Sequence, residues 1–241
     1  PKAGEYFFMG SGGKLVPFTG ASNQYFNYGP YNSINRPDTR YEGGFFAHYK
    51  VDPMLEVYSS LMFTDDRSSW QAAPTAAFLG AGLDSGAVDV SCSNPLLTGT
   101  DFKSFFCNSP TDTAQVFIGR RNVEQGGRIT EYKHATYRIV LGLKGNITDD
   151  LQYDISGQHS RTDYAQAYLN DWSKQRVQNA LLVDSSGKCE IYASDKACVP
   201  LDIFHGFGAI TPAMQTYVGN HLQEAGYTEE NVLSASIGGA T

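Results

Sequence analysis

The sequence predicts an all-β protein, namely an antiparallel transmembrane β-barrel segment with long extracellular loops. Three observations predict this fold class. Apolar and polar residues alternate with a period of two in several segments, which is typical of strands with one wet face. The connections between these segments are alternately very short and very long. The chain of 241 residues is also rich in residues that favour turns and strands, with 25 Gly, 15 Tyr and 14 Phe.

The charge of the chain argues against some partners. Charged residues make up 18% of the sequence, below the share of about 25% that is usual in soluble domains. The formal net charge of −7 argues against nucleic acid or an anionic membrane surface as a partner. No run of about 20 apolar residues suggests a membrane-spanning helix, but the strands of a barrel alternate and need no such run.

Five segments alternate cleanly, and the first four form two predicted antiparallel hairpins, Tyr41–Thr64 and Tyr137–Ser160. Tight turns at Asp52–Met54 and Thr148–Asp150 join the strands of each hairpin. We expect both turns on the same side of the molecule, as in barrels whose short turns share one end. The alternating segments are residues 41–51, 55–64, 137–144, 151–160 and 232–239.

The alternation assigns each side chain to one of two faces. In a membrane barrel the apolar face meets lipid and the polar face meets the lumen. A register slip of one residue would turn the polar set toward hydrocarbon. The residues expected to face lipid are Phe45, Tyr49, Val57, Leu61, Ile139, Leu141 and Ile155. The residues expected to face the lumen are Glu42, His48, Glu56, Arg138, Asp154 and Gln158.

The second hairpin is predicted to extend beyond the membrane. Gln115–Arg121 and Arg128–Leu143 are interpreted as one long strand, interrupted by a bulge at Gly126-Gly127. The return strand is expected to continue through Arg161–Trp172. A tilted strand needs about 9–11 residues to cross the hydrocarbon. These strands are longer, so the remainder would rise above the outer surface.

Two long connections separate the alternating segments, one of about forty residues after the first hairpin and one at roughly residues 183–228. Outer-membrane barrels alternate short periplasmic turns with long outer loops, whereas compact soluble sandwiches rarely contain loops of this length. The second connection carries one predicted helix, which Thr211 caps, Pro212 opens and Gly226 ends. We interpret this helix as a brace for the loop.

The four cysteines fall as two local pairs, Cys92 with Cys107 and Cys189 with Cys198. Zinc sites favour cysteines about two to four residues apart or nearby His ligands, and neither pair has these features. We therefore predict two disulfides, each within its own loop. Disulfides persist in oxidising compartments, which indicates the periplasm or the cell surface.

Several stretches resemble the barrel domain of TonB-dependent outer-membrane receptors. They are residues 117–128 (FIGRRNVEQGGR), 198–204 (CVPLDIF), 36–41 (RPDTRY) and 210–212 (ITP). The resemblance implies a 22-strand barrel that is filled by a plug domain and imports a small solute with energy from TonB. Residues 1–241 are accordingly expected to be an internal part of that barrel domain, without the plug domain and the remaining strands. The implied partners are outer-membrane lipid, TonB through the plug domain absent from this chain, and the solute.

No catalytic or metal-binding pattern emerges from the sequence. The five histidines are scattered and none belongs to a His-Glu-x-x-His motif. Ser185 and Lys188 match a Ser-x-x-Lys motif, but its partner motifs are missing and the surrounding residues are typical of a flexible loop. We expect no enzymatic activity, no cofactor and no metal.

Aromatic and basic residues near the long loops are the candidates for solute binding. Trp70, Tyr164, Tyr168 and Trp172 lie at the outer ends of strands, where they could stack on a sugar, an aromatic siderophore or a peptide. Arg120 and Arg121, near Glu124 and Arg128, could hold an anionic ligand in a bidentate manner. The alternatives are an ordinary structural role for the aromatics and, for the arginines, pairing with Glu124, Asp163 or Glu131 across strands.

Three functions from different classes fit these observations. The first is an importer of a siderophore, carbohydrate or similar small solute in the bacterial outer membrane. The second is a passive porin or another surface β-barrel, whose strands and loops would look the same over this stretch. The third is a secreted β-sandwich that binds polysaccharide; dependence on detergent would separate it from the other two.

Overall fold

A computed structural model describes residues 6–77 and 87–239. Antiparallel β-sheet predominates, which confirms the all-β class. The chain forms two compact units. The loop unit comprises residues 1–33, 71–129 and 169–221, and the sheet unit comprises residues 34–70, 130–168 and 222–241. No helix in the described residues is long and apolar enough to cross a membrane.

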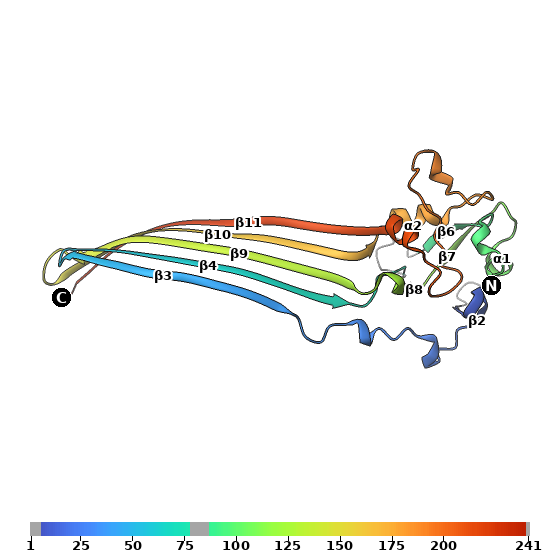
Figure 1. Ribbon diagram of the computed structural model, residues 1–241, viewed down its shortest axis with the longest axis horizontal. Helices are drawn as coiled ribbons and strands as arrows, with labels where there is room; N and C mark the ends of the chain where they lie inside the picture. The colour runs from blue at the N-terminus through green and yellow to red at the C-terminus, as the bar shows by residue number, and fades with distance from the viewer. Residues whose placement is uncertain (1–5, 78–86, 240–241) are drawn as a thin grey trace. The chain divides into compact units, whose positions relative to one another are not determined.

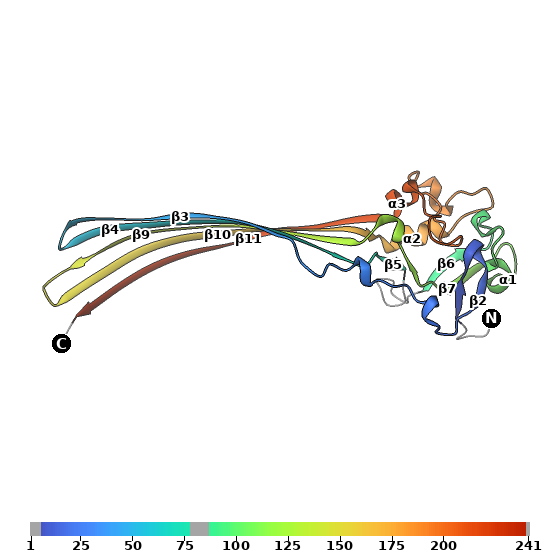
Figure 2. The ribbon, with the colours of Figure 1, turned by 60° about the horizontal axis from the view of Figure 1, so that its bottom comes forward.

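The sheet unit is built from five long strands that lie side by side in one twisted sheet (Figures 1 and 2). Their order across the sheet follows their order in the chain, so the chain passes up and down between neighbours. This arrangement makes β3 and β11 the two edge strands. The strands are β3 (Asp38–Asp52), β4 (Leu55–Ala72), β9 (Arg128–Asn146), β10 (Leu151–Trp172) and β11 (Gly219–Gly239).

The first predicted hairpin is confirmed as β3 and β4. Its register pairs Phe45 with Leu61 and Tyr49 with Val57, so these apolar side chains share one face. A register shift between Lys50 and Asp52 marks a bulge beside the turn. The Asp52 carboxylate accepts a hydrogen bond from the Met54 N–H at 2.8 Å, which is the local bond by which Asp favours turns.

The second predicted hairpin is confirmed as the hydrogen-bonded neighbours β9 and β10. The two turns lie side by side at one end of the sheet (Figure 1). The Asn146 N–H donates to the Pro53 carbonyl at 3.1 Å, and the Tyr153 hydroxyl donates to the Met54 carbonyl at 2.9 Å. The prediction that both turns occupy the same side is therefore correct.

The prediction of one long strand through Gln115–Arg121 and Arg128–Leu143 is wrong. The segment divides into β7 (Thr113–Phe117), β8 (Arg120–Arg121), a 3-10 turn at Val123–Gln125 and then β9. Gly126 follows the 3-10 turn with a φ of 80°, a left-handed conformation that glycine adopts without strain. It therefore redirects the chain instead of forming a bulge. The expected continuation of the return strand is correct, because β10 reaches Trp172.

The loop unit contains short elements. Three two-stranded sheets pair β1 (Phe7–Met9) with β2 (Leu15–Pro17), β5 (Ala76–Ala77) with β8, and β6 (Ala87–Ser91) with β7. The α-helices are α1 (Phe102–Phe106), α2 (Lys174–Leu181) and α3 (Pro212–Val218). The remaining 3-10 helices are Ser11–Gly13, Ser22–Gln24, Gly29–Tyr31, Pro95–Leu97 and Glu190–Ala193.

The long connections bury a hydrophobic core of their own within the loop unit. Helix α2 contributes its apolar side, and Phe204 packs edge-on against Phe102 with ring centroids 5.2 Å apart. Fully buried members come from both connections, which shows that these connections fold against each other. They include Val88, Val90, Leu97, Ala180, Leu181, Leu201, Phe204 and Val218. The part of the first connection at residues 78–86 lies outside the described residues.

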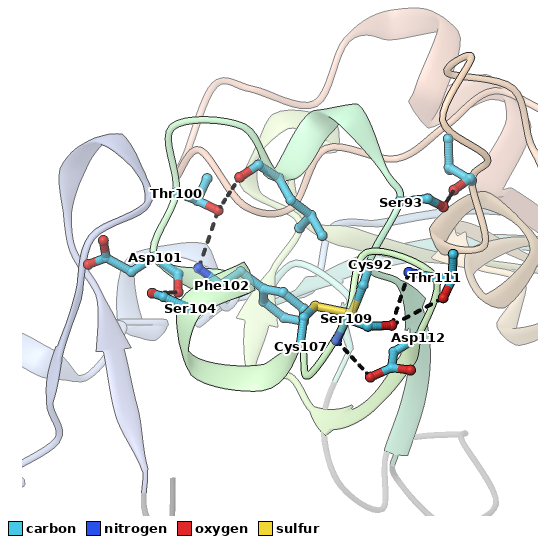
Figure 3. The surroundings of a disulfide bond; sticks show 12 residues. Cys92, Ser93, Thr100, Asp101, Phe102, Ser104, Cys107, Ser109, Thr111 and Asp112 are labelled. Atoms are coloured by element: carbon cyan, nitrogen blue, oxygen red, sulfur yellow. Dashed lines mark hydrogen bonds between the residues drawn. A yellow bond between two sulfur atoms is a disulfide. The ribbon is translucent and has the colours of Figure 1, made fainter.

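Both predicted disulfides are confirmed. Cys92 pairs with Cys107 and Cys189 with Cys198, with Cα–Cα distances of 5.9 and 6.2 Å. Figure 3 shows the first bond beside a tight turn, in which the Asp112 carboxylate accepts from the Ser109 N–H at 2.9 Å. Each disulfide closes a short loop around residues of the loop-unit core.

The predicted loop helix is present as α3, but its predicted end is wrong. The Thr211 hydroxyl accepts a hydrogen bond from the Met214 N–H at 3.4 Å and Pro212 occupies the first turn, as expected. The helix ends at Val218, and β11 begins directly at Gly219. Gly226 lies inside this strand. The second long connection is therefore shorter than residues 183–228, and the fifth strand is longer than residues 232–239.

Candidate functional site

The two faces of the five-stranded sheet differ in chemistry. Cross-strand contacts show which residues share a face. On the polar face, Tyr58 of β4 reaches Asp154 of β10, and Gln158 of β10 reaches Glu230 of β11. On the apolar face, β3 and β4 place Phe45, Tyr49, Val57 and Leu61 together. The predicted division of side chains between two faces is therefore correct for the strand pairs that these contacts connect.

The apolar face carries a continuous band without a charged side chain in the described strands. The band begins at the turns and consists of the odd-numbered residues within 41–49 of β3, 55–63 of β4, 137–145 of β9, 151–157 of β10 and 233–239 of β11. Most of its large side chains are exposed, with Leu141 at 62%, and the others are half-buried. Each segment is seven to nine residues long, which approaches the about 9–11 residues with which a tilted strand crosses hydrocarbon. We call these residues the apolar band.

A polar ladder marks the margin of the apolar band on the side away from the turns. The Tyr137 hydroxyl lies 3.3 Å from His159 Nε2, and His159 Nδ1 lies 2.8 Å from Asn231 Oδ1. The ladder therefore crosses three neighbouring strands at one level.

Charged residues follow directly beyond this margin on the same face. Arg67 pairs with Asp65 at 2.7 Å, and Arg161 pairs with Asp163 at 2.7 Å. Lys133 lies 4.0 Å from Asp65. The change from uncharged to charged side chains thus takes place within about one row of residues along the strands. An antiparallel sheet with one solvated face does not by itself need such a boundary.

The polar face carries a charged network at the level of the apolar band. Glu56 lies between His48 at 3.2 Å and Lys144 at 3.4 Å. The Tyr58 hydroxyl donates to Asp154 at 2.7 Å. The network joins β3, β4, β9 and β10, so these polar groups satisfy one another on the face opposite the apolar band.

Two shallow hollows lie on the polar face, with volumes of about 440 and 550 Å³. Ionic and hydrogen-bonding side chains dominate their walls. The first is lined by Lys50, Asp52, Glu56, Lys144, Gln152 and Asp154, among others. The second is lined by Phe46, His48, Tyr58, Ser60, Arg138 and Val140, among others. Water and small polar solutes are the species that such walls accommodate.

The aromatic residues that the sequence singled out do not form one site in the structure. Trp70 is exposed near the end of β4, and Tyr164 and Tyr168 are half-buried on β10. The Tyr164 hydroxyl hydrogen-bonds Gln166, and its ring lies 5.2 Å from the ring of His134. Trp172 belongs to the loop unit, where it packs against the hydrophobic core.

The two candidate arginines form hydrogen bonds within the loop unit. Arg120 is 7% exposed and forms a buried ion pair with Glu124 at 2.5 Å. It also donates to the Gly206 carbonyl at 2.8 Å. Arg121 donates to the Pro74 carbonyl at 2.8 Å. The expected alternative of pairing with Glu124 is therefore correct for Arg120, although the partner lies four residues along the same loop and not across strands.

Glu124 holds a neighbouring turn as well as Arg120. Its carboxylate accepts a hydrogen bond from the Gly208 N–H at 2.8 Å. Burial alone would raise the pKa of Glu124, but the hydrogen bonds from Arg120 and from backbone N–H groups outweigh burial and leave the pKa below its ordinary value. The ion pair and these bonds clamp residues 206–208, which we call the Phe207 turn.

An aromatic cluster that the sequence did not reveal surrounds the Phe207 turn. The ring of Phe207 lies 5.9 Å from the ring of Phe26, and the ring of Phe26 lies 5.6 Å from that of Tyr31. Arg120 stacks over Phe207 at 5.2 Å, and Arg121 over Tyr28 at 5.9 Å. Residues 26–31 and 207 are far apart in the chain, so no local pattern could have indicated this cluster.

Within the described residues, no group of three or more His, Cys, Asp or Glu side chains is placed to hold a metal ion. Comparison of the chain with protein-family models, curated proteins and solved structures finds no match.

Proposed function

We propose that the sheet unit is part of a transmembrane β-barrel of the bacterial outer membrane and that the protein imports a small solute. The observation that carries the proposal is the apolar band, which is uncharged on all five strands and lies opposite a charged face. Lipid would contact the band, and the polar face would line the lumen. The disulfides support this location, because they persist in oxidising compartments.

The energetic argument favours lipid over water next to the band. Exposed Phe, Leu, Ile and Val side chains cover the band on neighbouring strands, and soluble monomers rarely expose apolar patches of more than a few hundred Å². An Arg or Lys on the lipid face at mid-membrane would cost about 2–4 kcal/mol, and an Asp or Glu somewhat less. The band carries no charged side chain, whereas the opposite face and the region beyond the band do. Charges are therefore placed only where this cost would not apply.

The unpaired edges of the two edge strands indicate that the barrel contains further strands. β3 and β11 are 15 and 21 residues long and each has one unpaired edge among the described residues. Backbone N–H and C=O groups cannot remain unpaired in hydrocarbon. We therefore propose that further strands pair with both edges, and that the up-and-down order of the five described strands continues around the barrel.

Active import is preferred to passive flow because of the residues that resemble TonB-dependent receptors, FIGRRNVEQGGR at 117–128 and CVPLDIF at 198–204. Both stretches fold in the loop unit, where they supply Arg120, Glu124 and core residues. An energised importer would stop accumulating solute when the proton gradient is collapsed. A passive porin would continue to equilibrate the solute under the same conditions.

Site-directed labelling tests the membrane proposal. Leu141→Cys on the apolar band and Gln158→Cys on the polar face are each treated with a lipid-soluble and a water-soluble thiol reagent, in membranes that contain the protein. We expect Leu141→Cys to react with the lipid-soluble reagent and Gln158→Cys with the water-soluble one. Burial of position 141 against protein, or equal reaction of both positions with the water-soluble reagent, would refute the barrel and with it the transport function.

A further inference from the structure

The segment at residues 15–33 has an unusual composition. It contains no charged residue but three Tyr, two Phe, three Asn and one Gln. Tyr with Ser, Gly and Asn is the composition of antibody paratopes, in which Tyr supplies rigid contact area and the small polar residues supply adaptable hydrogen bonds. In this segment Tyr25, Tyr28, Asn23 and Asn27 are exposed. The surface is therefore aromatic, polar and uncharged.

Side-chain hydrogen bonds hold the segment in a defined conformation. Gln24 accepts from the Thr19 N–H at 2.8 Å and donates to the Pro17 carbonyl at 3.0 Å. The Asn27 side-chain Oδ1 accepts from the Gly29 N–H at 3.1 Å, which fixes the turn that carries Tyr28. The exposed rings are therefore preorganised, and preorganisation lowers the entropic cost of binding.

A second segment completes the surface. Phe207 is 59% exposed and stands beside Phe26. Its turn is held from within by the buried Arg120–Glu124 pair, which bonds the Gly206 carbonyl and the Gly208 N–H. An exposed Phe on a turn fixed by a buried ion pair is a rigid apolar anchor. We call Tyr25, Tyr28, Phe26, Tyr31 and Phe207 the aromatic surface.

The charge of the aromatic surface decides which ligand class it suits. Two cations lie against its rings, Arg120 over Phe207 and Arg121 over Tyr28. Arg120 is buried and bonded to Glu124, and Arg121 donates to the Pro74 carbonyl. Both guanidinium groups lie over aromatic rings and therefore support them. An uncharged ring compound with many hydroxyl groups can stack on the aromatic rings and can hydrogen-bond the amide side chains at the same time.

We propose that the aromatic surface binds a neutral carbohydrate, whose sugar rings stack on Phe207 and Tyr28 while Asn and Tyr side chains hydrogen-bond the hydroxyl groups. The inference rests on the proposed function in one respect, because it names the class of solute that the importer takes. The surface lies wholly within the loop unit, so binding of carbohydrate can be measured whether or not the sheet unit proves to span a membrane.

The test screens the full chain, with its disulfides formed, against an array of neutral hexose and pentose oligosaccharides. The detergent must have no sugar headgroup, because such a headgroup would compete for the surface. The dissociation constant of the best oligosaccharide is then measured by calorimetry for the unaltered chain and for variants. Oligogalacturonate serves as the anionic comparison, and we expect it to bind at least tenfold more weakly than the neutral ligand.

The variants separate ring stacking from general structural damage. Phe207→Ala and Tyr28→Ala should each weaken binding about tenfold or more, as expected for aromatic anchors. Tyr28→Phe keeps the ring and should remain within about threefold of the unaltered chain. Phe117→Ala is the matched control, because Phe117 is 60% exposed on β7 of the same unit but lies outside the aromatic surface. It should leave the dissociation constant unchanged.

Three results would overturn the inference. They are the absence of binding to any neutral oligosaccharide, tighter binding of the anionic comparison, and equal losses for Phe117→Ala and Phe207→Ala. The labelling of positions 141 and 158 is independent of all three. Lipid labelling without carbohydrate binding would therefore refute the ligand class alone, and carbohydrate binding without lipid labelling would refute the membrane barrel alone.

Discussion

The Tyr58 hydroxyl on β4 donates a hydrogen bond to the Asp154 carboxylate on β10 at 2.7 Å, although β9 lies between these two strands. Gly142 of β9 makes the bond possible. A Cβ atom at position 142 would lie 2.2 Å from Tyr58 Cζ, so the ring occupies the space that any other residue would fill. Three strands of the sheet are thus joined by one side chain lying over a glycine.

Gly142→Ala should destabilise the sheet by about 1–3 kcal/mol, the usual cost of forcing extra atoms into a packed position. The measurement is the free energy of unfolding in urea, with the protein in detergent. Gly157→Ala is the matched control, since a Cβ there meets no atom within 4 Å. The control should be neutral or slightly stabilising, because alanine restricts the unfolded chain more than glycine does. Equal effects at both positions would contradict the packing argument.

Leu141→Arg should cost about 2–4 kcal/mol of stability in a bilayer if the apolar band faces lipid. Val140→Arg places the same charge one residue away, on the polar face beside the second hollow, and should cost much less. Unfolding of both variants from lipid vesicles measures the difference. A larger cost at position 140 than at position 141 would show that the faces are assigned the wrong way round.

Replacing either disulfide with a pair of serines should destabilise the loop unit by about 2–4 kcal/mol. The Cys92–Cys107 pair, with a sequence separation of 15, should cost slightly more than the Cys189–Cys198 pair, with a separation of 9, because the longer loop loses more entropy on closure. Thermal unfolding of both double variants measures the two costs. Peptide mapping without reductant checks the pairing, and a cross-link between the two loops would contradict it.

Glu124→Ala should cost about 3–5 kcal/mol, because it leaves the buried guanidinium of Arg120 unpaired. The double variant Arg120→Met with Glu124→Leu removes both charges and should cost less than Glu124→Ala alone. Chemical denaturation of the full chain measures these differences. Should the double variant prove as unstable as the single one, the ion pair would not be the source of the loss.

The low pKa of Glu124 predicts the direction of a pH dependence. A carboxyl group with a lowered pKa in the folded state contributes stability above its unfolded pKa, and that stability is lost as the pH falls through the folded value. The loss should therefore appear below the ordinary Glu pKa of about 4.3. Faster hydrogen exchange of the Gly208 N–H, which donates to Glu124, reports it. Glu124→Gln should abolish the change in this range.

The local pattern of the sequence was sufficient for features that depend on neighbouring residues. Alternation located both hairpins, and Asp52 and Thr148–Asp150 located their turns. The disulfides were predictable because each pair closes a short loop. The end of the loop helix was not, because Gly219 and Gly226 are equally acceptable stops. The helix ends at Val218 because the chain joins the sheet as β11 from Gly219 onward.

The candidate site shows the same limit for residues that are distant in the chain. Arg120 had several acidic groups within plausible reach, and only folding of the loop unit brought the Phe207 turn and Glu124 to it. The aromatic surface joins residues 26–31, in the segment before β3, to residue 207 of the second long connection. Neither segment has a periodicity that specifies its partner.

By itself the sequence determined where the two hairpins and their turns lie and how side chains alternate between the two faces of these strands, because strand periodicity and tight turns are local properties of the backbone. Only the tertiary structure decided that β4 pairs with β9, that the long connections share a core, and that Arg120 and Phe207 belong to one cluster. These contacts close long loops, and the free energy that favours them comes from burial shared among many distant residues.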